Sequence, residues 1–336
     1  MLLGSEVCLF SNSQGLMLFA KGCTVAEKYR IERVLGQGGM GTVYCAQHLL
    51  LDRAVAIKIL RADATENPLA SERLLREGRA LAKLRGRHIA RVLDIEVEES
   101  GSCFLVLEYL EGEDLGSVLA REGPLPVARA ITYVLQVCEA LAEAHRLGIV
   151  HRDIKPSNLF LTTLEDGSSG IKVIDFGISK QAQPATALTQ SRAMLGSPCY
   201  MAPEQMRANG AVDARSDIWA LGVVLYELLV GVPPHSGSSV LEICADILES
   251  SPKSAKAMRT EIPDAVDAAI RKCMARDPTQ RFSSVSELSS ALVHYSGTGT
   301  ERLGSILPDD SSLQGPNTPP FADARLSDPG QHTVTA

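Results

Sequence analysis

The segment HRDIKPSN, residues 151–158, gathers several chemically capable side chains within eight positions. Asp153 is a carboxylate that could orient a hydroxyl group and accept its proton. Lys155 is a cation suited to the charge on a transferring phosphoryl group. Asn158, and Asp175 in the later sequence IDFG, are oxygen donors, which are the ligands that Mg²⁺ prefers. Together these residue types indicate the chemistry of phosphoryl transfer.

A short strand is expected to carry Asp175 to its place. The sequence IKVIDFG predicts a strand that ends at the turn residue Gly177, which leaves Asp175 at the strand end, where metal-bound phosphates could reach it. A DFG tripeptide alone is weak evidence. His-Arg-Asp, a lysine two residues later, an asparagine three further and then DFG form a combination that random sequence would very rarely supply.

A glycine-rich segment, VLGQGGMGTVY, lies upstream and contains Gly36, Gly38 and Gly41, followed by Val43. Glycines let backbone amides approach a phosphate without obstruction by Cβ. A plain hairpin or a dinucleotide-binding turn would share this pattern. A dinucleotide-binding fold should begin a helix at the third glycine, whereas TVYCAQH and RAVAIKIL both read as strands. The sequence therefore favours a loop that covers phosphates between two strands.

Lys58 lies in the second of these strands and shares a face with Ala56 and Leu60. A lysine is more usually a solvated edge residue, so a functional interpretation needs a partner carboxylate. The segment SERLLREGRALAKL predicts a helix with Glu77 on its apolar stripe. We expect Lys58 and Glu77 to form an ion pair that holds the lysine against nucleotide phosphates. For Glu77 alone, a carboxylate at the rim of the stripe is the alternative.

These motifs together resemble the eukaryotic-like (Hanks-type) serine/threonine protein kinase family, bacterial type, over about residues 28–296. The resemblance implies transfer of the γ-phosphoryl group of ATP to Ser or Thr hydroxyls of proteins, with Mg²⁺, or alternatively Mn²⁺. The site residues that it implies are Asp153, Lys155, Lys58 and Glu77 for catalysis, Asn158 and Asp175 for metal, and Gly36, Gly38, Gly41, Val43, Ala56, Lys58, Glu108, Leu110 and Phe160 for ATP.

The resemblance also implies an α+β, bilobal protein kinase fold. The smaller N-lobe, residues 28–110, would hold five antiparallel strands and one regulatory helix, and the larger C-lobe, residues 111–296, would be mostly helical. Apolar residues that recur at spacings of three and four predict C-lobe helices at 127–148 and 264–277. ATP would lie between the lobes.

Several packing and anchoring roles follow from the resemblance alone. Leu107 would be the gatekeeper before a hinge of residues 108–110, whose backbone would hydrogen-bond adenine. Glu204 is expected to pair with Arg281, and Asp217 to anchor the backbone of the catalytic loop. The segment RGRHIARVLD departs from the usual HPNIV pattern, which puts only a local turn in doubt. The residues of an expected hydrophobic stack are Leu81, Leu93, His151 and Phe176.

Regulation by phosphorylation is expected because Arg152 precedes the candidate base. Kinases with this arginine commonly need a phosphorylated activation loop to offset its charge. The candidate sites are Thr186, Thr189 and Ser191. Thr189 and Ser191 resemble the sites that bacterial relatives autophosphorylate, and ordinary polar loop residues are the alternative. Ser197 stands where serine/threonine kinases carry a hydroxyl that bridges the catalytic aspartate and lysine.

Composition agrees with a cytoplasmic enzyme. The chain has 336 residues, 45% of them hydrophobic, and a formal net charge of −7, which argues against a general nucleic-acid or membrane-surface binder. Its eight cysteines show no close pairs of zinc or redox spacing, so we expect reduced thiols. The longest apolar run, WALGVVLYELLVGV, is too short to span a bilayer and contains Glu227. It predicts a buried core helix, and we expect no membrane anchor.

The two ends of the chain differ from its middle. Residues 1–27 form an expected N-terminal extension, either a docking arm or an extra strand on the N-lobe. Residues 297–336 are rich in Gly, Ser, Thr, Pro and Asp without apolar periodicity, which predicts a disordered tail.

Two other classes of protein share parts of this pattern. A pseudokinase scaffold usually lacks one of Lys58, Asp153 or Asp175, and all three are present. A small-molecule kinase has no need of the peptide-positioning segment GSPCYMAPE. As partners we expect protein substrates with Ser or Thr and no nucleic acid or membrane, with a homodimer as an option for autophosphorylation.

Overall fold

The structure is a computed structural model, and it describes residues 9–11, 17–38, 41–60, 75–76, 78–97, 103–176, 198–207 and 210–297. The chain divides into two compact units, Met1–Thr300 and Glu301–Ala336. All described residues belong to the first unit. Residues 298–336 of the predicted disordered tail lie outside the described residues.

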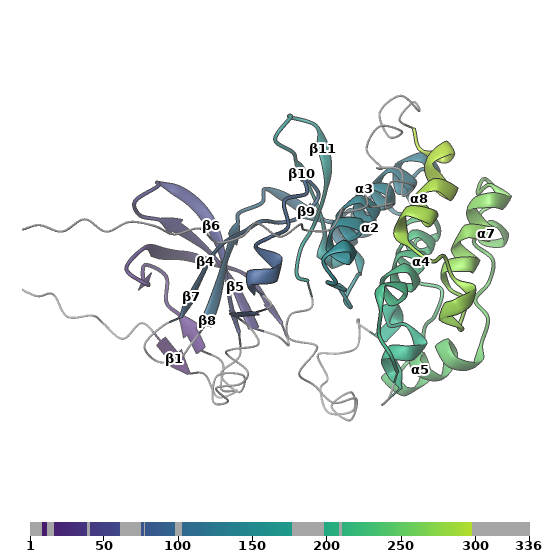
Figure 1. Ribbon diagram of the computed structural model, residues 1–336, viewed down its shortest axis with the longest axis horizontal. Coiled ribbons are helices and arrows are strands. Elements are labelled where there is room, and N and C mark those ends of the chain that lie inside the picture. The colour runs from purple at the N-terminus through teal and green to yellow at the C-terminus, as the bar shows by residue number, and fades with distance from the viewer. Residues whose placement is uncertain are drawn as a thin grey trace, which may run out of the picture. The chain divides into compact units, whose positions relative to one another are not determined.

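The N-lobe contains a six-stranded antiparallel sheet with the order β3-β4-β5-β6-β8-β7. Its strands are β3 (Thr24–Val25), β4 (Tyr29–Gly38), β5 (Gly41–His48), β6 (Arg53–Leu60), β7 (Val92–Val97) and β8 (Cys103–Glu108). The Tyr29 hydroxyl donates to Asp94 at 3.4 Å and so joins β4 to β7, which are not neighbours in the sheet. The sheet is therefore curled, as Figure 1 shows.

Part of the predicted N-terminal extension packs into the N-lobe core. Strands β1 (Leu9–Ser11) and β2 (Met17–Phe19) form a separate hairpin, and β3 adds a sixth strand to the five that we expected. The Phe19 amide donates to the Tyr44 hydroxyl at 3.1 Å, and the two rings meet edge to face at 5.9 Å. Phe19, Cys23 and Val25 are buried members of the core cluster that contains Tyr44. The expectation of reduced thiols is wrong for Cys23, which is disulfide-bonded.

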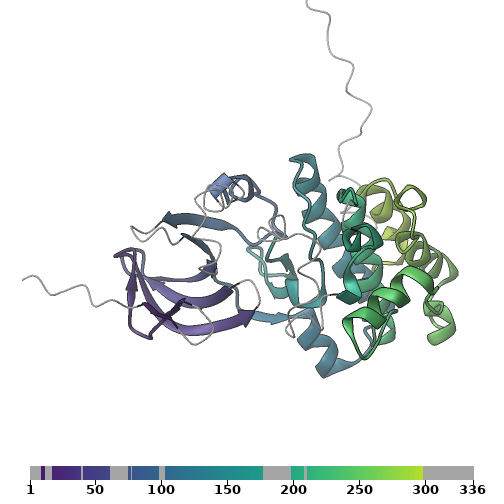
Figure 2. The same cartoon turned by 90° about the horizontal axis from the view of Figure 1, so that it is seen from below.

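The C-lobe is mostly helical, and Figures 1 and 2 show its helices gathered apart from the N-lobe strands. Its helices are α2 (Leu115–Glu122), α3 (Val127–Arg146), α4 (Ala214–Val230), α5 (Val240–Glu249), α6 (Ala255–Met258), α7 (Asp264–Cys273) and α8 (Val285–Leu292). Helices α3 and α7 confirm the two helices predicted from periodicity. Within the described ranges, no helix is both long enough and apolar enough to cross a membrane.

Helix α4 is the buried centre of this lobe, as the apolar run predicted. Asp213 caps its start by accepting from the Arg215 amide, and Gly231 ends it with a φ of 92° that favours glycine. A Cβ at Gly222 would lie 2.5 Å from the Cβ of Cys273, so glycine is required where α4 and α7 approach each other. The core helix thereby holds Asp217, near its start, in a fixed position.

A three-stranded antiparallel sheet, β11-β10-β9, lies directly after the hinge and leads to the IDFG segment. Its strands are β9 (Gly112–Asp114), β10 (Leu159–Thr163) and β11 (Ser169–Val173). The segment before β7 is joined to this sheet, because Ala90 donates to the Val173 carbonyl at 3.0 Å and Val173 donates to the His88 carbonyl at 2.8 Å. The segment that departs from the HPNIV pattern is therefore fixed to β11 by backbone hydrogen bonds.

Candidate active site

Helix α4 anchors the catalytic loop, residues 151–158, which contains the candidate base Asp153. The carboxylate of Asp217 accepts hydrogen bonds from the backbone amides of His151 at 2.9 Å and Arg152 at 2.8 Å. A third partner, the Nε2 of His145, lies 2.8 Å from the same carboxylate. Asp217 is only 1% exposed, so these contacts form where water does not compete. The predicted anchoring role of Asp217 is confirmed.

Three predicted site residues of this loop contact one another. The Lys155 ammonium lies 3.1 Å from Asp153 Oδ2. The Asn158 side-chain amide donates to the Asp153 carbonyl at 2.8 Å and to its carboxylate at 3.3 Å. Asn158 ends a short 3-10 helix, η2 (Pro156–Asn158), in which proline fixes the first residue. The spacing of this motif thus places the side chains of Lys155 and Asn158 in contact with Asp153.

Asp175 and Lys58 form an ion pair of 2.8 Å between the IDFG segment and strand β6. The side chain of Lys58 is 8% exposed, so its charge lies in a largely desolvated position with a carboxylate beside it. Asp175 has a φ of 58°, which is rare for a residue other than glycine. The predicted partner Glu77 lies outside the described residues, so the Lys58–Glu77 pair remains a prediction.

The two halves of the site are joined through Ile174. Its amide donates to the Asn158 carbonyl at 3.0 Å, and its carbonyl lies 3.1 Å from Nε2 of His151. Asn158 and Asp175, the predicted metal ligands, are therefore held on neighbouring backbones. The structure brings both candidate ligands to the same place as the candidate base.

The expected hydrophobic stack is formed in part. The rings of His151 and Phe176 lie 4.6 Å apart, and burial lowers the pKa of His151 below its ordinary value. Phe176 and Leu81 both line a cavity of about 30 Å³, together with Lys58 and residues of β8 and β11. Leu93, the fourth expected member, packs against the N-lobe core cluster.

The glycine-rich segment lies at the ends of two paired strands, as predicted. Strand β4 ends at Gly38, which pairs with Gly41 at the start of β5. A Cβ at Gly36 would meet no atom within 4 Å, so the packing of the protein does not require glycine there. Open space beside a backbone that could approach phosphate fits the predicted role. Residues 39–40, at the tip, lie outside the described residues.

The residues predicted to enclose adenine lie on strands of both lobes. In the N-lobe, Val43 pairs with Lys58 across β5 and β6, and Ala56 pairs with the predicted gatekeeper Leu107 across β6 and β8. In the C-lobe, Phe160 lies in β10. Glu108 and Leu110 are half-buried at the end of β8 and just after it.

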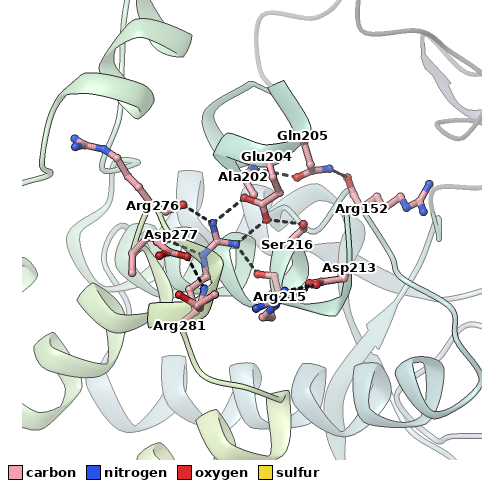
Figure 3. Close-up of polar contacts among 12 residues, drawn as sticks. Arg152, Ala202, Glu204, Gln205, Asp213, Arg215, Ser216, Arg276, Asp277 and Arg281 are labelled. Carbon is pink, nitrogen blue, oxygen red and sulfur yellow. Dashed lines mark hydrogen bonds and ion pairs between the residues drawn. The ribbon is translucent and has the colours of Figure 1, made fainter. Parts of the chain in front are cut away.

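The predicted pair of Glu204 and Arg281 is confirmed as the centre of a buried network (Figure 3). The guanidinium donates to both carboxylate oxygens, at 2.7 and 2.8 Å, and the two side chains are 0% and 8% exposed for arginine and glutamate. Ser216 donates to Glu204 at 2.6 Å. Burial alone would raise the pKa of Glu204, but the hydrogen bonds from Arg281 and Ser216 outweigh it and hold the pKa below its ordinary value.

Gln205 links this network to the catalytic loop, and the sequence analysis missed it. Its side chain donates to the Arg152 carbonyl at 3.1 Å and accepts from the Ala202 amide at 2.9 Å, as Figure 3 shows. A glutamine directly after Glu204 carries no periodic signal that would have revealed this contact. The candidate phosphorylation sites and Ser197 lie outside the described residues.

The antiparallel N-lobe and helical C-lobe define the fold class of the protein kinases, as expected. The chain belongs to this family, because the family model for the protein kinase domain matches residues 29–294. Serine/threonine-protein kinase PknB of Mycobacterium tuberculosis is 34% identical over 318 residues, which cover 90% of this chain and 50% of that protein. The chain thus spans about half the length of the curated relatives that it matches.

Solved structures agree with this assignment. The kinase domain of Mycobacterium tuberculosis PknI has a TM-score of 0.65 at 29% identity, covering 83% of this chain and 100% of that one. Rad53, in a complex with AMP-PNP, has a TM-score of 0.64 at 25% identity, covering 79% of this chain and 64% of that one. The chain is therefore similar to kinase domains over most of its length.

Proposed function

We propose that this protein is a serine/threonine protein kinase that transfers the γ-phosphoryl group of ATP to Ser or Thr hydroxyls of protein substrates. The observation that carries the proposal is the meeting of Asp153, Asn158 and Asp175 around the Ile174 backbone, with Lys58 paired to Asp175. A base, a phosphate-binding cation and two oxygen ligands are the parts that phosphoryl transfer needs. Names of relatives such as PknB support the same activity.

ATP and a divalent metal fit the residues present. The space beside Gly36 leaves room for phosphates, and Lys58 supplies a buried cation on β6, two strands away from β4 in the same sheet. Asn158 and Asp175 would hold Mg²⁺, with Mn²⁺ as an alternative, and bound metal would neutralise charge on the phosphates. Similarity to Rad53, whose structure contains AMP-PNP, supports the use of an adenine nucleotide.

The chain's own residues would divide the work as follows. Asp153 orients the substrate hydroxyl and accepts its proton, while Lys155, held 3.1 Å from it, faces the charge of the transferring group. Asn158 keeps the Asp153 carboxylate in place through its side-chain amide. Val43, Ala56 and Phe160 enclose adenine, and the backbone at Glu108 and Leu110 hydrogen-bonds to it.

Regulation and assembly extend this proposal. We infer that autophosphorylation at Thr189 and Ser191 activates the enzyme, with Thr186 as a further site, and that it acts in the cytoplasm. A homodimer would bring the activation segment of one copy to the site of another.

The proposal is tested by incubating the purified chain with Mg²⁺, [γ-³²P]ATP and a generic Ser/Thr substrate. We expect phosphorylation by the wild type and its loss in Asp153→Asn, with nucleotide binding retained. The matched control is Asp264→Asn, because the Asp264 side chain is 87% exposed and lies in α7. Phosphosite mapping then tests Thr189 and Ser191. A wild type that binds ATP without transferring phosphate would identify a pseudokinase scaffold instead.

A further inference from the structure

A buried ion pair connects the hinge to the strand that leads to Asp175. Glu108 is the last residue of β8, and Lys172 is the next-to-last residue of β11. The Lys172 ammonium lies 2.6 Å from Glu108 Oε1, although 64 residues separate them in the sequence. Lys172 lies in the segment IKVIDFG, but the sequence motifs assign it no role.

The sheet register directs Lys172 towards the predicted adenine site. Phe160 pairs with Asp114 on one side and with Lys172 on the other, so these three residues form one row across β9, β10 and β11. Directly opposed residues of antiparallel strands lie on the same face of a sheet. Lys172 therefore shares a face with Phe160, the residue expected beneath adenine.

The pair is desolvated, which makes its geometry restrictive. The side chain of Lys172 is 7% exposed and that of Glu108 is 15% exposed. An ammonium group in such a position is strongly disfavoured without its counter-charge. Glu108 is thus held where the Lys172 ammonium can reach it, and the hinge backbone is held with it.

Arg91 clamps the same hinge residue from the other side. Its backbone amide donates to Glu108 Oε1 at 2.8 Å, and the Glu108 amide donates to the Arg91 carbonyl at 3.0 Å. The Arg91 guanidinium lies 4.0 Å from Glu108 Oε2 and 2.9 Å from Glu165. The segment HIARV stands where the family's HPNIV pattern would place isoleucine at this position, so the departure supplies a cation to the hinge.

We propose that Lys172 is a positioning residue for ATP, whose ammonium holds the Glu108 carboxylate and so fixes the hinge backbone that receives adenine. The inference rests on the proposed function, because it names how that function's nucleotide is positioned. Lys172 acts on binding rather than on phosphoryl transfer, since the contacts among Asp153, Lys155 and Asn158 do not involve it. Arg91 is the weaker second clamp because its side chain is 45% exposed.

The test measures binding of two probes to the full chain. AMP-PNP with Mg²⁺ contains both base and phosphates, whereas adenosine contains no phosphate, and each competes with a fluorescent methylanthraniloyl-ADP. We expect Lys172→Met to weaken both probes by about tenfold, a change that breaking a buried pair can readily supply. The kcat at saturating ATP should stay within about twofold of wild type, because KM carries the effect.

Two further variants distinguish a positioning role from general loss of structure. Glu108→Gln combined with Lys172→Met removes both charges, so the folding stability measured in urea should recover because no unpaired charge remains. The double variant still lacks the contact that holds the hinge, so it should bind both probes more weakly than the wild type does. Lys256→Met is the control, since Lys256 pairs with Asp264 at 2.6 Å on the exposed surface between α6 and α7. That variant should bind both probes as the wild type does.

Three results would overturn the inference while wild-type binding is normal. They are unchanged affinity for both probes in Lys172→Met, weaker binding of AMP-PNP alone, and a double variant that binds both probes as tightly as the wild type does. If Lys172→Met does not fold, Glu108→Gln cuts the pair from its other end, and wild-type adenosine affinity there would equally refute it. A wild type that binds neither probe defeats the proposed function itself, whereas binding without transfer defeats only its catalytic part.

Discussion

The buried pair of Arg281 and Glu204 supports a quantitative prediction for the substitution Arg281→Met. Methionine keeps an unbranched side chain but removes the two hydrogen bonds to Glu204, at 2.7 and 2.8 Å. It also removes the donors to the carbonyls of Arg215, at 2.9 Å, and Ala275, at 2.8 Å. Glu204 would keep the Ser216 hydroxyl as a donor, in a site where its side chain is 8% exposed.

The magnitude follows from leaving a charge without its partner. Removing one member of a buried ion pair costs about 3–5 kcal/mol of folding free energy. Domains of ordinary stability unfold with about 5–15 kcal/mol, so the variant should fold but lose a large fraction of its stability. Glu204→Gln combined with Arg281→Met leaves no unpaired charge. The unfolding free energy of this double variant should therefore exceed that of Arg281→Met by about 2 kcal/mol or more.

Urea unfolding measures this effect directly. Trp219 is the single tryptophan of the chain, it is buried, and the Arg281 guanidinium lies 5.1 Å from its ring. Its fluorescence therefore reports unfolding at the site of the change, while circular dichroism of the helices reports the whole lobe. Coincident transitions from both probes would license two-state free energies.

A control and a refuting result complete the test. Arg121→Met breaks an exposed pair with Glu113, with side chains 56% and 37% exposed, and should change stability little because exposed pairs contribute little. The reasoning fails if Arg281→Met costs less than about 1 kcal/mol, or if the free-energy changes of the two single substitutions simply add in the double variant.

Three further predictions follow from the described contacts. Asp217→Asn weakens the acceptor of two backbone amides of the catalytic loop. In a phosphorylation assay kcat/KM should therefore fall about tenfold or more, while the affinity for AMP-PNP changes less. Equal losses in kcat/KM and in AMP-PNP affinity would contradict the anchoring role. The folded protein holds the pKa of Glu204 below its ordinary value of 4.5. The ionised carboxylate therefore stabilises the fold fully above pH 4.5, and this stabilisation is lost as the pH falls through the pKa of the folded state. The difference in unfolding free energy between wild type and Arg281→Met, measured in urea, should narrow in acid. Burial raises the pKa of Cys138 to about 12 and also raises that of Cys273, so maleimide labelling read by mass spectrometry should modify both only after unfolding.

Local patterns predicted the helices and the polar loop well. The periodicity of residues 127–148 and 264–277 encodes one buried face, and that requirement fixes a helix whatever it packs against. The spacing within HRDIKPSN likewise decides its own contacts, because a short 3-10 helix returns Asn158 to Asp153. The resemblance to kinases supplied Glu204 and Arg281, which no local pattern joins.

Pairings between distant segments were the part that sequence could not fix. The sequence motifs offer Lys58 more than one candidate carboxylate partner. Its ion pair with Asp175 depends on how β6 packs against the segment that follows β11. The cysteines of the chain show no close spacing typical of a redox or zinc pair, so the disulfide of Cys23 was missed. Gln205 and Lys172 contact a carbonyl and a carboxylate supplied by remote strands and loops. Such contacts follow from tertiary packing, which is invisible to a residue's neighbours in sequence.

Among the described residues, two of the five that are not glycine and have a positive φ lie in the candidate active site. Arg152 and Asp175 have φ angles of 64° and 58°, a conformation that costs residues other than glycine about 1–2 kcal/mol. Both are held by bonds from other elements. The Arg152 amide donates to Asp217 and its carbonyl accepts from Gln205, while Asp175 is paired with Lys58.

The positions of these restraints explain why the buried network matters for chemistry. Asp217 belongs to the core helix α4, and Gln205 follows Glu204, which Arg281 fixes at both carboxylate oxygens. Arg152 directly precedes Asp153. Its strained backbone conformation is held by two hydrogen bonds, one to Asp217 of α4 and one from Gln205. Loosening either support should therefore let Arg152 relax towards a common conformation and turn Asp153 away from the place where Asn158 and Lys155 now hold it.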